Sequence, residues 1–103
     1  MAFEVRLTLP AAHDRENIVA YLLDELRSRQ AAESFLACFD ERVEQIATLP
    51  ESCPLCRVES LARRGYRSAL VGRYLFVYSI DEQSQTIDIL RVFHGSQDYV
   101  YLL

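Results

Sequence analysis

Polar side chains that could catalyse a reaction or bind an anion gather near the end of the sequence. They lie in or directly after the apolar run of residues 87–93 and are Arg91, His94, Gln97 and Asp98. A histidine can act as a general acid or base, provided that a second group holds the substrate against it. A lone histidine more often packs or caps a turn. The pattern therefore leaves a catalytic His94 and a structural His94 both open.

A local excess of arginine lies in the middle of an acidic chain. The formal net charge is -4, yet residues 57–79 hold five arginines and a single acid, Glu59. We call these arginines the basic segment: Arg57, Arg63, Arg64, Arg67 and Arg73. Such a segment can attract a polyanion or an acidic protein partner.

Each arginine of this region can be interpreted in two ways. Strand alternation places Arg67 on one face with Ala69 and Val71, from where its long side chain could meet a phosphate. The plainer interpretation of an arginine here is a surface residue or an ion pair with Asp88 or Asp98.

The two cysteines of Cys53-Pro-Leu-Cys56 do not form a convincing redox or metal motif. A thioredoxin-like pair stands at the start of a helix after a strand, whereas this pair follows a helix that Pro50 ends. No second cysteine or histidine pair is near enough to complete a zinc site. We expect an ordinary reduced loop, no metal and no cofactor.

The first half of the chain reads as a strand followed by two helices. Apolar residues alternate over residues 3–9, which predicts a half-buried strand. Helical spacing then runs over residues 12–29 and again over residues 32–49, where Pro50 ends it. The short link between the two helices predicts an antiparallel hairpin.

The second half reads as three strands, at residues 66–71, 74–80 and 86–94, after a loop over residues 50–64 with a short extended piece at 57–61. The connections between these strands are too short for parallel crossovers, so they predict an antiparallel meander. In the last strand, simple alternation puts Ile87, Ile89, Arg91 and Phe93 on one face. We expect one α+β domain over residues 1–103, ordered β-α-α-β-β-β, with helices on one face of a single sheet and a groove on the other.

No apolar run of membrane-spanning length and no basic leader is found in the sequence. The expectation is a cytoplasmic protein without a membrane partner.

Two stretches resemble a known family. GYRSALVGRYLFVYSID and IDILRVFHGSQDYVYLL are similar to the C-terminal half of the RelE/ParE superfamily, the toxins of bacterial type II toxin–antitoxin modules. The helical hairpin ending in Leu-Pro also fits. The resemblance implies a toxin held inactive by a cognate antitoxin, whose tail wraps the toxin and often adds a helix or a strand to it.

The resemblance leaves two targets. RelE-like members cut mRNA on the ribosome, whereas ParE-like members are linked to inhibition of DNA gyrase. Where relatives often carry Arg or Lys shortly after the histidine, this chain has Ser96 and Gln97, and its net charge disfavours binding to ribosomal RNA. We therefore favour a ParE-like growth inhibitor of the plasmid-stabilisation type, acting on gyrase. The alternatives are an mRNA interferase, which is an endoribonuclease, and a degenerate member without toxicity.

The resemblance also assigns roles to residues. For a RelE-like nuclease the catalytic candidates are Arg67, Arg73, Arg91, His94 and a tyrosine such as Tyr78 or Tyr101. For binding of the target or the antitoxin the candidates are Arg63, Arg64, Arg67, Arg73, Gln97, Asp98 and Tyr99.

Overall fold

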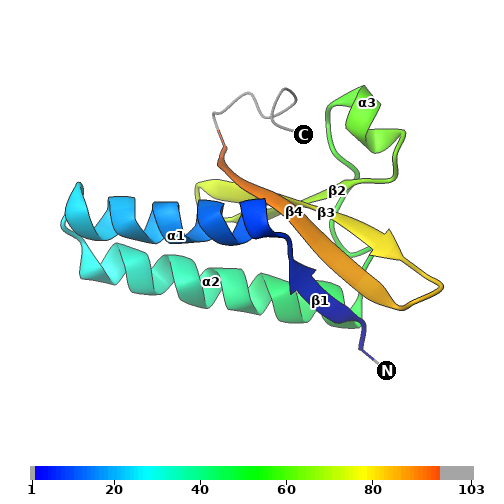
Figure 1. Cartoon of the computed structure of the whole chain (residues 1–103), viewed down its shortest axis with the longest axis horizontal. Coiled ribbons are helices and arrows are strands. Elements are labelled where there is room, and N and C mark those ends of the chain that lie inside the picture. The colour runs from blue at the N-terminus through cyan, green and yellow to red at the C-terminus, as the bar shows by residue number, and fades with distance from the viewer. Residues whose placement is uncertain (1, 96–103) are drawn as a thin grey trace.

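A four-stranded sheet carries two long helices on one face and a short helix on the other (Figure 1). The computed structural model describes residues 2–95. Its elements are β1 (Glu4–Leu7), α1 (Leu9–Asp24), α2 (Arg29–Thr48), α3 (Glu59–Ala62), β2 (Arg67–Val71), β3 (Tyr74–Asp81) and β4 (Thr86–His94). The strand order is β1-β4-β3-β2; β1 runs parallel to β4, and the other neighbours are antiparallel. The predicted α+β class and the predicted order β-α-α-β-β-β are confirmed, with α3 as an addition. Within the described part, no helix is both long and apolar enough to cross a membrane.

Local capping sets the bounds of the two long helices. The Thr8 hydroxyl accepts a hydrogen bond from the backbone N–H of Ala11 at 3.2 Å, and the Ser28 hydroxyl accepts one from Ala31 at 3.0 Å. Helix α1 therefore begins three residues before the predicted start. It ends at Asp24 rather than at residue 29, because the chain turns back before α2 with Arg27 in the left-handed region at φ 49°.

The main core lies between the helix pair and the sheet. From α2 come Phe35, Phe39 and Ile46, which pack on the sheet residues Phe76 and Ile89. The Phe39 and Phe76 rings lie 5.4 Å apart between centroids. Burial of these side chains fixes the hairpin on one face of the sheet.

The opposite face of the sheet is covered too, which corrects the expectation of an open groove there. The connection between α2 and β2 places Cys56 and Leu61 over Leu75, Val77 and Phe93, all of them buried. The extended piece predicted at residues 57–61 is also wrong. Residues 59–62 are helical, and the extended contact is a bridge between Leu55 and Arg67 instead.

A β-bulge inverts the predicted alternation of β4. Tyr78 pairs with Ile89 while Val77 pairs with Arg91, so Leu90 is an extra residue in β4. Beyond the bulge, Val92 joins Ile89 in the main core, and Phe93 packs on the α3 side. The prediction that Arg91 and Phe93 share a face with Ile87 and Ile89 is therefore wrong.

The two cysteines of the Cys-Pro-Leu-Cys stretch belong to different cores. Cys53 packs in the main core under the helices, and Cys56 packs with Leu61 on the other face of the sheet. Both thiols are free and buried, and burial raises the pKa of Cys56. This arrangement makes the pair unsuited to a disulfide or a shared metal.

Candidate functional site

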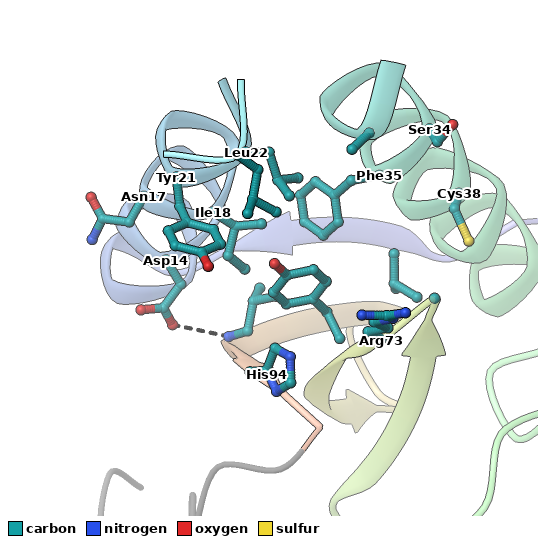
Figure 2. Close-up of a pocket in the computed structure, with 16 residues that line it drawn as sticks. Asp14, Asn17, Ile18, Tyr21, Leu22, Ser34, Phe35, Cys38, Arg73 and His94 are labelled. Atoms are coloured by element: carbon teal, nitrogen blue, oxygen red, sulfur yellow. Dashed lines mark hydrogen bonds between the residues drawn. The ribbon is translucent and has the colours of Figure 1, made fainter. Parts of the chain in front are cut away.

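A groove of about 990 Å³ opens at the end of the sheet, between the helix pair and the ends of β3 and β4 (Figure 2). Helices α1 and α2 form two of its walls, and the turn between β2 and β3 closes the third side. The groove thus lies on the helix-covered side of the sheet, not on the face that the sequence pattern suggested.

The floor of the groove is apolar. Leu22 and Phe35 are buried there, beside Ile18, and the Phe35 ring meets the Tyr74 ring edge-on at 5.2 Å. At the rim, Tyr21 is 49% exposed and Leu26 is 54% exposed. Large apolar side chains left in water around a concave surface are typical of a site for a protein partner.

One end of the groove is polar and basic. Arg73, from the turn after β2, and His94, from the end of β4, both border it (Figure 2). Tyr74 is the strand partner of His94, and the two rings meet edge-on at 5.4 Å and 82°. Burial and nearby Tyr21 raise the pKa of the Tyr74 hydroxyl, while the charge of Arg73 opposes this rise. The phenol therefore stays neutral and can donate or accept a hydrogen bond.

A glycine holds this end together. Gly95 donates its N–H to the carbonyl of Arg73 at 2.8 Å. A Cβ atom at Gly95 would lie 3.0 Å from that same carbonyl oxygen, which is backbone and cannot swing aside. A side chain at this position would push the end of β4 and the β2–β3 turn apart by a few tenths of an ångström.

On the other side of the groove, Asp14 ties α1 to β4. Its carboxylate accepts hydrogen bonds from Arg91 Nε at 2.7 Å, Arg91 Nη2 at 3.0 Å and the Val92 N–H at 2.9 Å. These contacts raise the pKa of Arg91 further. The predicted partner Asp88 instead pairs with Arg6 at 3.2 Å. Arg91 thus fastens a helix to a strand at the edge of the groove.

Arg67 and Tyr78 lie away from the groove, at the start of β2 and in the middle of β3. Arg67 donates to the carbonyl of Cys53 at 2.6 Å and lies 3.8 Å from Glu51. The Tyr78 hydroxyl donates to the carbonyl of Pro50 at 2.7 Å, and its side chain has no exposed surface. Burial raises the pKa of this hydroxyl. Both residues hold the loop that follows α2, so we do not place them in the site.

The basic segment divides into two surfaces. Arg63 pairs with Glu59 at 2.6 Å, and Arg64 lies over the Tyr66 ring at 5.9 Å, both beside α3. Strand β2 separates them from Arg73 by roughly 13 Å at the usual rise per residue. Only Arg73 borders the groove. Gln97, Asp98, Tyr99 and Tyr101 lie outside the described residues.

Sequence reasoning missed three residues of the site: Asp14, Tyr21 and Phe35. Asp14 lies four and seven residues before Ile18 and Tyr21, on one face of α1. That spacing would have placed a carboxylate on the apolar stripe, which is a usable signal for a buried ion pair. Within residues 2–95, no group of three or more potential metal ligands comes together.

One comparison with known proteins shows the family of this chain. The family described as ParE toxin of type II toxin-antitoxin system, parDE, matches residues 5–99. No curated protein matches the sequence.

Solved structures share the fold over most of the chain. The toxin-antitoxin complex RelBE2 from Mycobacterium tuberculosis is 24% identical with a TM-score of 0.65, covering 91% of this chain and 99% of that one. The chromosomal ParDE TA system from P. aeruginosa is 16% identical with a TM-score of 0.70, covering 90% and 96%. The archaeal RelE-RelB complex from Pyrococcus horikoshii is 14% identical with a TM-score of 0.57, covering 94% and 99%.

Proposed function

The chain belongs to the ParE toxin family of type II toxin–antitoxin systems, and from this premise we propose that it stops growth by binding DNA gyrase in the cytoplasm rather than by cutting RNA. The proposed partners are gyrase and a cognate antitoxin.

The observation that carries the proposal is the separation of the nuclease candidates. Cleavage through a ribose 2′-hydroxyl needs a base, an acid and a cation within hydrogen-bond reach of one phosphate. Among the described residues, Arg73 and His94 both line the groove, whereas Arg91 is held by Asp14. Arg67 and Tyr78 hold a loop elsewhere. This distribution supports a binding surface over a catalytic centre.

The groove is the proposed site of the antitoxin. Its apolar floor, with Ile18 and Phe35, suits the apolar stripe of an amphipathic helix, and Arg73 suits an acidic residue at one end of that helix. A helix in this groove would cover Tyr21 and Leu26, which are left exposed in the free toxin.

A second candidate function rests on the polar end of the groove. Arg73, Tyr74 and His94 converge there, with the Tyr74 and His94 rings in contact. A RelE-like mRNA endoribonuclease would have to work with these three side chains, a cation, a neutral phenol and an imidazole, without Arg67, Arg91 and Tyr78. A degenerate, non-toxic member is the third reading.

The deciding experiment is pulse-labelling of DNA and protein synthesis just after the toxin is induced without antitoxin. An early fall in DNA synthesis supports gyrase, and an early fall in protein synthesis supports RNA cleavage. Absence of either fall supports a degenerate member.

The same assay on the variant His94→Ala separates catalysis from binding. For a gyrase inhibitor, loss of one rim side chain should weaken growth inhibition severalfold at most. For a nuclease, loss of a general acid or base should reduce cleavage by roughly a hundredfold or more. Arg57→Ala, on the α3 side, is the matched control for expression and folding.

A further inference from the structure

Among the described residues, no strand lies beside the outer edge of β1. Glu4 and Thr8 donate their N–H groups to Gln85 and Ile89, so the even-numbered residues of this segment face β4. The backbone groups of Val5 and Leu7 therefore point to the other side, where β1 is the end of the sheet. An edge of this kind is a template for a further strand.

Other segments of the chain cover the remaining edges of the sheet, which sets the β1 edge apart. Along β2, Ser68 donates its N–H to the carbonyl of Pro54 at 3.0 Å, and Arg42 donates to the carbonyl of Leu70 at 2.9 Å. Along β4 beyond β1, the Thr8 hydroxyl donates to the carbonyl of Leu90, and Asp14 accepts from the Val92 N–H. Within residues 2–95, β1 has one comparable contact, from the Phe3 N–H to the carbonyl of Ala47 at 2.8 Å.

The sequence of β1 is complementary to itself in the antiparallel direction. If two copies pair about Val5, each Glu4 lies opposite the Arg6 of the other copy, and each Phe3 lies opposite the other Leu7. The Val5 pair then exchanges two backbone hydrogen bonds. Opposite charges thus meet on one face of the joined sheet, and apolar side chains meet on the other.

Two exposed leucines bracket this edge. Leu9 follows the strand and is 78% exposed, while Leu49 is 62% exposed and lies two residues after Ala47, the residue bonded to Phe3. The same pairing places Leu9 of one copy toward the end where Leu49 of the other copy lies. Both leucines would lose contact with water there.

We propose that a second copy of this chain binds the β1 edge, so that two toxins join their sheets through antiparallel β1 strands about a two-fold axis. The contact is isologous, since each copy gives the same four-residue strand. The strand is short, so the association is weak and depends on concentration.

The test is sedimentation velocity of the purified chain over a concentration series. The wild-type mass should rise from 11.9 kDa toward twice that value. Glu4→Arg sets arginine against arginine, and Arg6→Glu sets glutamate against glutamate, so each variant alone should associate roughly tenfold more weakly. An equimolar mixture of the two variants should associate as the wild type does, because each arginine then faces a glutamate.

Glu41→Arg, on the exposed side of α2, makes the same charge change away from β1 and should leave association unchanged. Amide exchange gives a second readout, because the Val5 and Leu7 amides should exchange more slowly as concentration rises. A wild type that stays monomeric throughout would overturn the proposal. So would a mixture that fails to associate, or a dimer that persists in every variant.

Discussion

Asp14 of α1 and Arg91 of β4 form an ion pair with two hydrogen bonds, just past the point where β1 stops pairing with β4. The two contacts measure 2.7 and 3.0 Å, and the same carboxylate accepts the Val92 N–H at 2.9 Å. The last residue of β1, Leu7, pairs with Ile89. Beyond that pair β1 no longer lies beside β4, and the Asp14 carboxylate accepts the backbone N–H of Val92 that a neighbouring strand would otherwise bond.

Asp14→Asn should lower the free energy of unfolding by about 2–3 kcal/mol, because it removes the Asp14 charge from a largely buried ion pair with Arg91. The Asp14 side chain is 15% exposed and that of Arg91 is 25% exposed. Urea unfolding followed by circular dichroism measures the change. Asp24→Asn, exposed at the end of the same helix, is the control and should fall within experimental error of the wild type. Equal midpoints for Asp14→Asn and wild type would show that the pair adds no stability.

Tyr78→Phe should cost about 1–2 kcal/mol at pH 7, because it removes the hydroxyl that donates to the Pro50 carbonyl and leaves a buried acceptor unsatisfied. Thermal unfolding measures this loss. Tyr21→Phe, at an exposed position, should leave Tm unchanged. If both variants melt together with the wild type, the Pro50 contact is not stabilising.

Alkaline pH should destabilise the protein through Tyr78. Burial raises the pKa of its hydroxyl above the ordinary 10.0, so the folded state holds a proton that the unfolded state has already released. The contribution is fully present below pH 10.0 and is lost as pH rises toward the folded-state pKa. Unfolding free energies measured between pH 9 and 11 should fall less steeply in Tyr78→Phe than in the wild type. Parallel slopes would contradict this assignment.

Gly95→Ala should disturb the groove more than the fold, because its added Cβ meets the Arg73 carbonyl oxygen at 3.0 Å. We expect about 1 kcal/mol of lost stability and a clear loss of growth inhibition as Arg73 and His94 move apart. Gly65→Ala is the matched comparison: it strains a residue at φ +80° but lies far from the groove along β2. Equal toxicity of the two variants at equal stability would argue against a role for this end of the groove.

Binding of the antitoxin should weaken as salt rises, through Arg73. This arginine borders the groove, and the screening length shortens from about 10 Å at 0.1 M salt to about 3 Å at 1 M. Titration calorimetry at several salt concentrations should give a shallower slope for Arg73→Gln than for wild type. Arg57→Gln should keep the wild-type slope, since α3 lies on the other face of the sheet. A change of slope in Arg57→Gln alone would move the antitoxin site to α3.

Periodicity and turn residues were sufficient to predict the element order. The two helices and three meander strands follow from local pattern, and the two helices begin three residues before their predicted starts because capping by Thr8 and Ser28 decided them. The bulge at Leu90 was not predictable in this way. One inserted residue moves every following side chain of the strand to the opposite face of the sheet. Nothing in the apolar pattern marks the position of the insertion.

The candidate site was predicted in part. Arg73 and His94 do border one groove. Arg91 was singled out from the sequence, but its partner Asp14 lies 77 residues earlier, and a pattern read along the chain cannot supply such a contact. Tyr78 became a nuclease candidate through the family resemblance, whereas its burial comes from packing by α2 and from Pro50, which are distant in sequence.

The parallel pairing of β1 with β4 also has a kinetic consequence. Arg6 and Asp88, partners in that ladder, are 82 residues apart, whereas the α1–α2 and β3–β4 hairpins form between near neighbours. Closing so long a loop costs conformational entropy before the strand contacts can offset that cost. The hairpins should therefore form first and the β1–β4 ladder late. The toxin should therefore pass through a collapsed, helix-containing stage without its first strand, and become active only when that strand docks.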